Sequence, residues 1–94
     1  MSTLWLVQRA DRGPDGLEGC LRVVRDGDAV LLIREGVYAV VGTAPEVPPG
    51  VELLALAADT HARGVTPDDG SARLVDDATF VEACTCHDRV VTWC

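Results

Sequence analysis

Two runs of apolar residues, at positions 29–33 and 51–57, dominate the hydrophobic pattern of the chain. A strand that is apolar on both faces is typical of the inside of a parallel sheet that helices cover on each side. Shorter apolar runs at 4–7, 73–75 and 90–93 predict further strands, the last of them at an edge of the sheet. The pattern therefore predicts strands at these five places.

Apolar residues at helical spacing follow the first strand. They recur at i, i+3, i+4 and i+7, one face of an amphipathic helix, and they are Leu17, Cys20, Leu21 and Val24. Asp15 is a suitable N-cap for this helix, because Glu18 three residues later can complete a capping box. Gly27 stands where a helix C-terminus favours a residue in the left-handed conformation.

The remaining segments are shorter. Asp59 is expected to cap a short helix that ends at Gly64, and residues 79–87 are helical by content. Residues 37–41 fit either a short helix or a strand, and periodicity does not decide between them. The stretch 45–50 holds three prolines and is expected to be a loop.

Strands that alternate with helices predict an α/β fold, a three-layer sandwich with a mostly parallel sheet. We expect residues 1–94 to form one domain, because single domains usually have roughly 100–150 residues. A domain of this size buries only about 60–65% of the surface that its unfolded chain exposes. We therefore expect that the isolated chain either self-associates or is poorly behaved, and that partners stabilise it.

The charge balance argues against several classes of partner. The chain has 15 acidic and 8 basic residues, a net charge of −7. Proteins that bind nucleic acid gain affinity by replacing phosphate counterions with Lys and Arg, so neither nucleic acid nor an anionic membrane is an expected partner. No apolar run approaches the ~20 residues that span a bilayer, and the first residues lack the basic region of a signal peptide. We expect a cytoplasmic protein.

The sequence lacks the motifs of common catalytic and cofactor sites. No Gly-rich phosphate-binding loop follows the first strand, and no serine lies in a nucleophile-elbow motif. We expect neither a cofactor nor a metal, and an accessory protein rather than a free-standing enzyme. Pairs of acidic residues fall in expected turns, and we interpret them as solvated. These pairs are Asp26/Asp28, Asp68/Asp69 and Asp76/Asp77.

The chain has four cysteines, Cys20, Cys84, Cys86 and Cys94. We expect reduced thiols, because the sequence shows no secretion signal. Cys84, Cys86 and His87 are close in sequence, but residues i and i+2 of a helix point roughly 200° apart. The two cysteines therefore cannot share one ion, and at least one of them is expected to pack against the core.

Cys20 has two interpretations that the residues leave open. It lies on the apolar face of the first helix, where burial against the sheet would raise the pKa of its thiol. That helix also follows the first strand directly, and open parallel sheets form functional crevices at the carboxyl ends of their strands. Arg9 and Arg12, just before the helix, would favour a thiolate. Cys20 is thus either a packing residue or a functional thiol.

Segments along nearly the whole chain match, in order and spacing, the pattern of a known family. They are residues 4–9, Leu17-Glu18-Gly19-Cys20-Leu21, residues 27–33, Glu35-Gly36-Val37-Tyr38-Ala39, Leu54-Ala55-Leu56 with Asp59 and Ala62-Arg63-Gly64, and a tail of Val75-Asp76, Phe80-Val81-Glu82, His87-Asp88-Arg89-Val90 and Trp93. In these segments the chain resembles the TusB/DsrH family of sulfur-relay subunits.

The resemblance implies a flavodoxin-like fold of the DsrE/DsrF/DsrH type. It implies a heterohexamer with DsrE/TusD-like and DsrF/TusC-like subunits and a DsrC/TusE-like sulfur acceptor. Such complexes pass persulfide sulfur, either for 2-thiolation of the tRNA wobble uridine or for dissimilatory sulfur oxidation. Cys20 matches a cysteine of the DsrH branch, which makes it the candidate catalytic thiol.

The chain departs from the family pattern at a few positions. Trp5 replaces the family's N-terminal histidine, Gln8 replaces its following Asn or His, and the three cysteines after Cys20 have no counterpart. These departures leave the pathway open. A function of another class also stays open, that of a stand-alone flavodoxin-like module that binds a small ligand or a protein.

Overall fold

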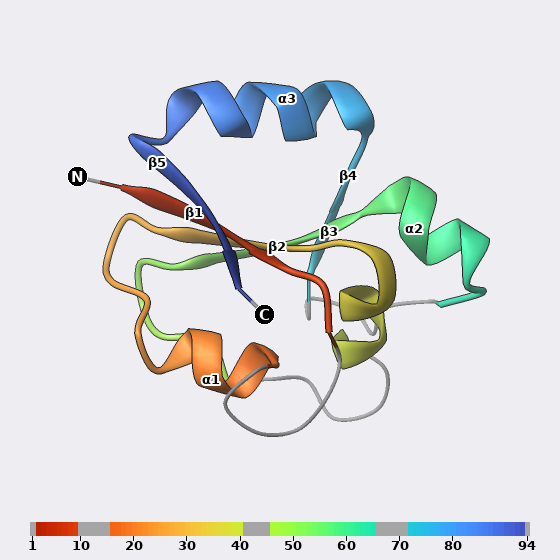
Figure 1. Cartoon of the computed structure of the whole chain (residues 1–94), viewed down its shortest axis with the longest axis horizontal. Coiled ribbons are helices and arrows are strands. Elements are labelled where there is room, and N and C mark those ends of the chain that lie inside the picture. The colour runs from red at the N-terminus through yellow and green to blue at the C-terminus, as the bar shows by residue number, and fades with distance from the viewer. Residues whose placement is uncertain (1, 10–15, 41–45, 66–71, 94) are drawn as a thin grey trace.

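The computed structural model describes residues 2–9, 16–40, 46–65 and 72–93. Strands and helices alternate along these ranges (Figure 1). The strands are β1 (Thr3–Val7), β2 (Ala29–Leu32), β3 (Glu52–Leu56), β4 (Arg73–Val75) and β5 (Arg89–Trp93). The helices are α1 (Leu17–Leu21), the 3₁₀ helix η1 (Arg34–Val40), α2 (Ala57–Ala62) and α3 (Asp77–Cys86).

The strands form one sheet in the order β4-β3-β2-β1-β5, and every neighbouring pair is parallel. β1 lies between β2 and β5, so that Trp5 is in register with Val30 on one side and Val91 on the other. The predicted α/β sandwich with a mostly parallel sheet is confirmed. The prediction that the last strand lies at an edge is also confirmed.

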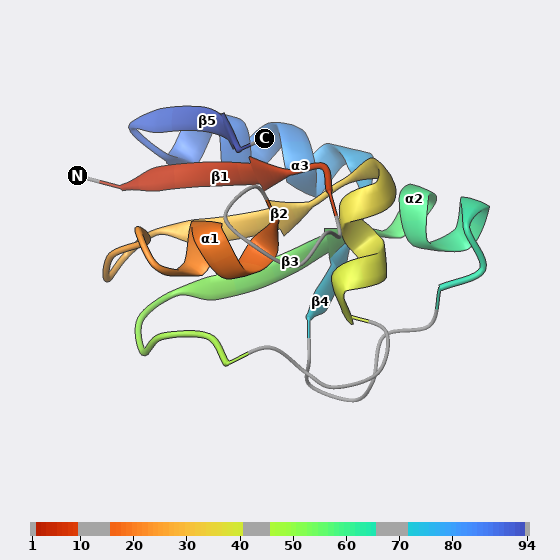
Figure 2. The same cartoon turned by 60° about the horizontal axis from the view of Figure 1, so that its bottom comes forward.

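Helices cover both faces of the sheet (Figure 2). The chain steps in one direction from β1 to β4 and then returns past β1 to β5. Because crossovers between parallel strands are right-handed, this reversal places α3 on the face opposite to α1. α2 follows β3 directly and packs against η1 at the carboxyl ends of the strands.

The core has two clusters, one on each face of the sheet, because successive strand residues point to opposite faces. The first core cluster lies under α1 and η1 and contains Val7, Leu17, Cys20, Val30, Leu32, Val37, Leu53, Ala55 and Val65. The second core cluster lies under α3 and contains Leu4, Ala29, Leu31, Leu54, Leu56 and Val75. β2 contributes to both clusters, as expected for a strand that is apolar on both faces.

The first helix is shorter than its hydrophobic pattern predicts. α1 ends at Leu21, its N-cap is Gly16, and no side chain caps it. Asp15, the expected cap, lies outside the described residues. Gly27 does adopt a left-handed conformation, with φ of 91°, but in the turn before β2 rather than at the helix end.

Two other helices differ in detail from the prediction. The expectation that Asp59 caps α2 is wrong, because the N-cap is Leu56 and Asp59 lies inside the first turn. α3 begins two residues earlier than predicted, because the Asp76 side chain accepts a hydrogen bond of 2.8 Å from the Thr79 amide. The open segment 37–41 belongs to η1 as far as Val40.

Candidate functional site

Cys20 lies on the inner face of α1 and is fully buried in the first core cluster. Burial, and to a lesser extent the negative charge of Asp28, raise the pKa of its thiol to about 12. With that pKa, the thiol is almost entirely protonated at pH 7. The structure thus places Cys20 in the position of a packing residue, which is one of its two interpretations.

The charges near Cys20 differ from those that the sequence suggested. Arg9 and Arg12 were expected to favour the thiolate, but the charge that acts on the thiol is the carboxylate of Asp28. Arg12 lies outside the described residues. A like charge next to a thiol disfavours ionisation, so the surroundings of Cys20 hold it in the neutral form.

Asp28 is a buried carboxylate at the start of β2, with 6% of its surface exposed. Its Oδ1 accepts a hydrogen bond of 2.9 Å from the Thr3 amide. Its Oδ2 accepts bonds of 3.1 Å from the Trp5 indole Nε1 and of 3.0 Å from the Arg25 amide. The interpretation of Asp28 as a solvated turn residue is therefore wrong, because the carboxylate connects β1 to the turn before β2.

The pKa of Asp28 reflects two opposing effects. Burial raises it, but hydrogen bonds from Trp5, Arg25 and Thr3, together with the charge of His87, lower it, and the net pKa lies below the usual value. Asp28 therefore stays ionised inside the protein because donors surround it. One sequence signal could have pointed to this site, since a tryptophan that is partly buried usually has a partner for its N–H.

The tail segment His87-Asp88-Arg89 attaches the C-terminal part of the chain to its start. The Asp88 Oδ2 accepts a hydrogen bond of 2.9 Å from the Ser2 amide, and the Asp88 amide donates one of 3.0 Å to the Ser2 carbonyl. Arg89 donates to the Thr3 hydroxyl at 3.4 Å. His87 Nδ1 donates to the Ala83 carbonyl at 2.8 Å and so helps to end α3. These residues hold β5 against β1.

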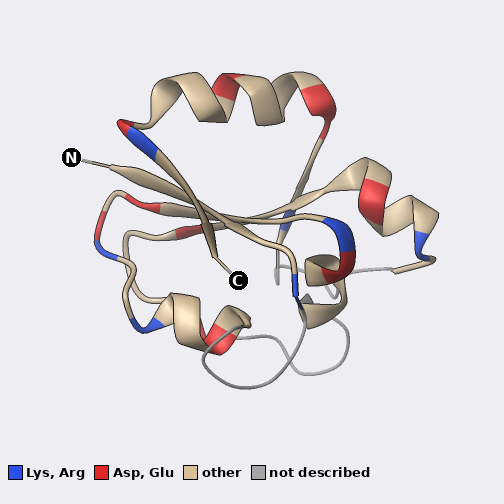
Figure 3. Cartoon of the chain, in the orientation of Figure 1, with Lys and Arg blue, Asp and Glu red and all other residues tan. Residues whose placement is uncertain are grey.

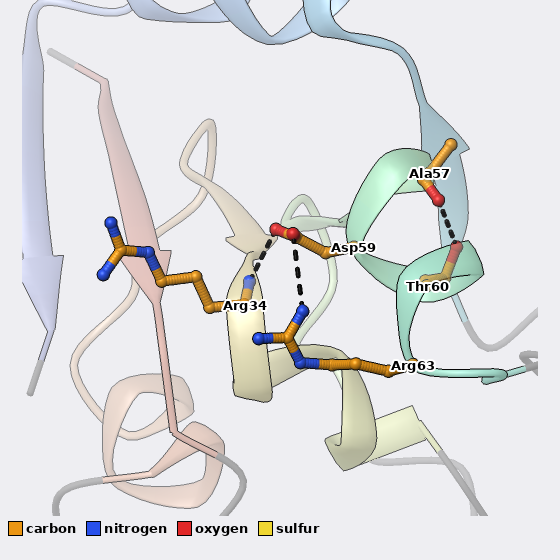
Figure 4. A network of polar contacts seen from close by, with 5 residues as sticks. All are labelled: Arg34, Ala57, Asp59, Thr60 and Arg63. Atoms are coloured by element: carbon orange, nitrogen blue, oxygen red, sulfur yellow. Dashed lines mark hydrogen bonds and ion pairs between the residues drawn. The ribbon is translucent and has the colours of Figure 1, made fainter.

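A second polar cluster lies at the carboxyl ends of β2 and β3 (Figure 4). The Asp59 carboxylate accepts a hydrogen bond of 2.6 Å from the Arg34 amide and forms an ion pair of 3.6 Å with Arg63. Thr60 is fully buried, and its hydroxyl donates to the Ala57 carbonyl at 2.8 Å. Arg34 and Asp59, which are 25 positions apart in the sequence, therefore meet in this cluster.

The backbone at the end of β2 is tightly constrained. Arg34 has φ of 50°, in the left-handed region that an arginine rarely adopts. The Ile33 amide donates to the Val7 carbonyl at 3.0 Å. A Cβ added to Gly36 would overlap that same carbonyl oxygen, so η1 can approach β1 only with glycine at this position. The Arg34 side chain points away from Asp59 (Figure 4).

The cysteines of α3 do not converge. Cys84 is half-buried and packs against the second core cluster, whereas Cys86 is exposed, as the helical spacing of the two predicts. Among the described residues, no three His, Cys, Asp or Glu side chains lie close enough to hold a metal ion. Cys94 lies outside the described residues.

Charged residues are spread over helices, strand ends and turns (Figure 3). In the described part of the chain they gather into no basic stripe, which agrees with the net charge of −7. Within the same residues, no helix is long and apolar enough to cross a membrane. Some charged groups connect neighbouring elements, as in the ion pair of 3.4 Å between Arg73 of β4 and Glu52 of β3.

Three polar groups of the described ranges have been located: the packed thiol of Cys20, the buried carboxylate of Asp28 and the ion-paired carboxylate of Asp59. Activation of a thiol for nucleophilic attack requires a neighbouring base or a lowered pKa. Cys20 has the opposite, a raised pKa and an acidic neighbour. The surroundings of Cys20 therefore do not activate its thiol.

Comparisons with known proteins identify the family of the chain. Residues 13–90 match the model of the DsrH-like protein family. The chain is also 32% identical over 82 residues to a protein of Pectobacterium parmentieri named Protein TusB, a match that covers 82% of this chain and 86% of that relative. The matched range includes Cys20, Asp28, Gly36 and Asp59. On the length of these matches, the chain belongs to the DsrH-like protein family.

Proposed function

We propose that this chain is an accessory subunit of a cytoplasmic sulfur-relay complex that passes persulfide sulfur between proteins. The observation that carries the proposal is the family match over residues 13–90. The surroundings of Cys20 support an accessory role, since they disfavour the thiolate that would accept sulfur.

In this proposal the partners are DsrE/TusD-like and DsrF/TusC-like subunits in a heterohexamer, with a DsrC/TusE-like protein as sulfur acceptor. The surface of the chain supports the need for partners. Several large apolar side chains are 42–63% exposed, namely Val23, Tyr38, Leu74, Val81 and Val90. The sulfur-carrying cysteine belongs to a partner, and this chain stabilises and shapes the assembly around it.

Sulfur carriage by Cys20 stays a prediction of the resemblance. In that step the Cys20 thiolate attacks the terminal sulfur of a partner's persulfide, the partner's cysteine leaves as a thiolate, and Cys20 becomes the persulfide. The step needs no oxidant, but α1 has to move so that Cys20 is reachable, because its side chain is fully buried. A role of Cys20 as a packing residue on the inner face of α1 requires no such movement.

Co-expression tests the assembly. The full chain carries an affinity tag and is produced with the DsrE-like and DsrF-like chains of the same genome. We expect the three chains to co-purify and to sediment as one hetero-oligomer. A chain that remains alone in the presence of both would contradict the proposal and would favour a stand-alone binding module.

A second experiment separates the two roles of Cys20. The assembled complex is incubated with a sulfur-loaded donor, and peptides are mapped by mass spectrometry for the mass of one added sulfur atom. We expect the adduct on a partner cysteine and unchanged transfer when Cys20 is replaced by Ala. An adduct on Cys20, with transfer lost in Cys20→Ala but not in Cys86→Ala, would instead make it a carrier. Comparing tRNA 2-thiouridine and sulfur oxidation in deletion strains then identifies the pathway.

A further inference from the structure

The outer edge of β5 has no partner strand among the described residues. β5 is the last strand in the sheet order, and within the described residues only β1 pairs with it. In Figure 2 β5 forms the margin of the sheet, on the side away from β4. Backbone N–H and C=O groups along such an edge can pair with a strand of another molecule.

β5 carries only part of the protection that is usual at an edge, because Arg89 is its one charged residue. Natural edge strands are short, carry inward charges or proline, or are bulged. The opposite edge follows this rule, because β4 has only three residues and Arg73 is ion-paired to Glu52. β5 has five residues, Arg-Val-Val-Thr-Trp, of which four are β-branched or aromatic. Such residues favour strand pairing.

The two faces of β5 are set by its register with β1. Arg89, Val91 and Trp93 are in register with Thr3, Trp5 and Val7, and they share the face of the sheet that α1 covers. Trp93 contacts Trp5 edge to face, with ring centroids 5.8 Å apart. Val90 points to the other face and is 42% exposed. β5 therefore has apolar side chains on both faces next to its outer edge.

We propose that β5 pairs with β5 of a second copy of this chain, in an antiparallel arrangement about a twofold axis at Val91. The order of side chains makes the strand complementary to itself. With Val91 opposite Val91, the Arg89 of each copy lies opposite Trp93 of the other, so that one interface contains two Arg–Trp pairs. Side chains directly opposite in an antiparallel pair have Cβ atoms about 5 Å apart, within reach of a cation–π contact.

This pairing joins two five-stranded sheets into one continuous sheet and is isologous, as expected for a twofold dimer. It does not rest on the proposed function, because it uses only the edge of β5 and a second copy. The net charge of −7 on each copy opposes association at low ionic strength. The test is therefore run at about 0.15 M salt, where charges more than ~8 Å apart are screened.

The experiment measures the sedimentation of the full chain over a range of concentrations. Val91→Lys and Val91→Glu each place like charges opposite one another across the axis, and each is expected to weaken the dimer by at least about tenfold. An equimolar mixture of the two variants places Lys opposite Glu and is expected to restore the dimer. Val81→Lys adds a charge at an exposed site on α3 and is the matched control, expected to dimerise like the wild type.

Circular dichroism checks that the variants fold, and restored association in the mixture shows the same. If Val91 variants do not fold, Val90→Lys, on the other face of the same edge, replaces them; it lies opposite Thr92 of the other copy, so its dimer is expected to weaken, but less than that of Val91→Lys. A wild-type chain that is monomeric at all concentrations overturns the proposal. So does a dimer that both Val91→Lys and Val90→Lys leave intact, or an edge variant that loses a DsrE-like or DsrF-like partner but not self-association.

Discussion

The charge of Asp28 acts on the thiol of Cys20 and raises its pKa, in the same direction as burial does. The carboxylate itself stays ionised, because Trp5, Arg25 and Thr3 donate hydrogen bonds to it. A second negative charge nearby is therefore unfavourable, and the thiol remains neutral at physiological pH. This relationship links the first strand, the first helix and the turn before β2, and it makes the chemistry of Cys20 depend on the fold.

The first prediction concerns alkylation of the cysteines. Iodoacetamide at pH 7.5 is expected to label Cys86, which is exposed, and to leave Cys20 unlabelled until the chain is unfolded by denaturant. Peptide mapping by mass spectrometry at successive times gives the two rates. Labelling of Cys20 as fast as Cys86 in the folded chain would show that α1 opens readily and would favour sulfur carriage.

The second prediction concerns stability at alkaline pH. The pKa of Cys20 is raised from 9.0 to about 12, so the neutral thiol stabilises the folded state fully below pH 9. This contribution is lost progressively as the pH rises from about 9 to about 12. Cys20→Ala is expected to remove this part of the alkaline decline, whereas Cys86→Ala keeps it. Urea unfolding at a series of pH values measures both, and equal slopes in the two variants would contradict the burial of Cys20.

The third prediction concerns Asp28. Asp28→Ala leaves one buried and two partly buried donors without their acceptor and is expected to cost about 3 kcal/mol of unfolding free energy. Asp28→Asn keeps one acceptor oxygen and is expected to cost about half as much. The Asp28 pKa is lowered from 3.8, so its stabilisation is present above that pH and is lost as the pH falls through the folded value.

The difference between wild type and Asp28→Asn should therefore shrink below about pH 4. Chemical denaturation between pH 2 and pH 7 measures it. Asp88→Asn serves as the control, because Asp88 accepts a hydrogen bond at an exposed site. A constant difference across this range would show that Asp28 stabilises the fold without its charge.

The fourth prediction compares two glycines. Gly36→Ala is expected to cost at least about 3 kcal/mol, because its Cβ would overlap the Val7 carbonyl and η1 would have to shift. Gly27→Ala meets no atom within 4 Å and carries only the conformational penalty of φ 91°, expected to be about 1 kcal/mol. Thermal and urea unfolding rank the two. Equal effects would mean that the contact between η1 and β1 is loose.

The fifth prediction concerns the cluster at the carboxyl ends of the strands. Asp59→Ala removes both the acceptor for the Arg34 amide and the partner of Arg63, and is expected to cost about 1–2 kcal/mol. Arg63→Ala removes only a partly exposed ion pair and is expected to cost less than about 1 kcal/mol. Urea unfolding of both variants checks the order. A larger effect of Arg63→Ala would place the stabilisation in the ion pair instead.

The sequence by itself determined the alternation of strands and helices and the fold class. Apolar runs such as 29–33 need cover on both faces, and a parallel sheet between helices typically provides it. The spacing of Cys84 and Cys86 likewise determined that they diverge, because a helix sets that angle locally. Order and spacing of short segments were also sufficient to indicate the family.

Only the tertiary structure decided the surroundings of the polar residues. The sequence pattern indicates a turn residue at Asp28. Its buried surroundings come from Thr3 and Trp5, which are more than 20 positions away and donate hydrogen bonds to its carboxylate. Asp59 looks like a helix cap, but the Arg34 amide reaches its carboxylate through the packing of η1 against α2. The choice between the two interpretations of Cys20 depends on burial and on a distant charge. Both arise from contacts between segments far apart in the chain, which local pattern does not contain.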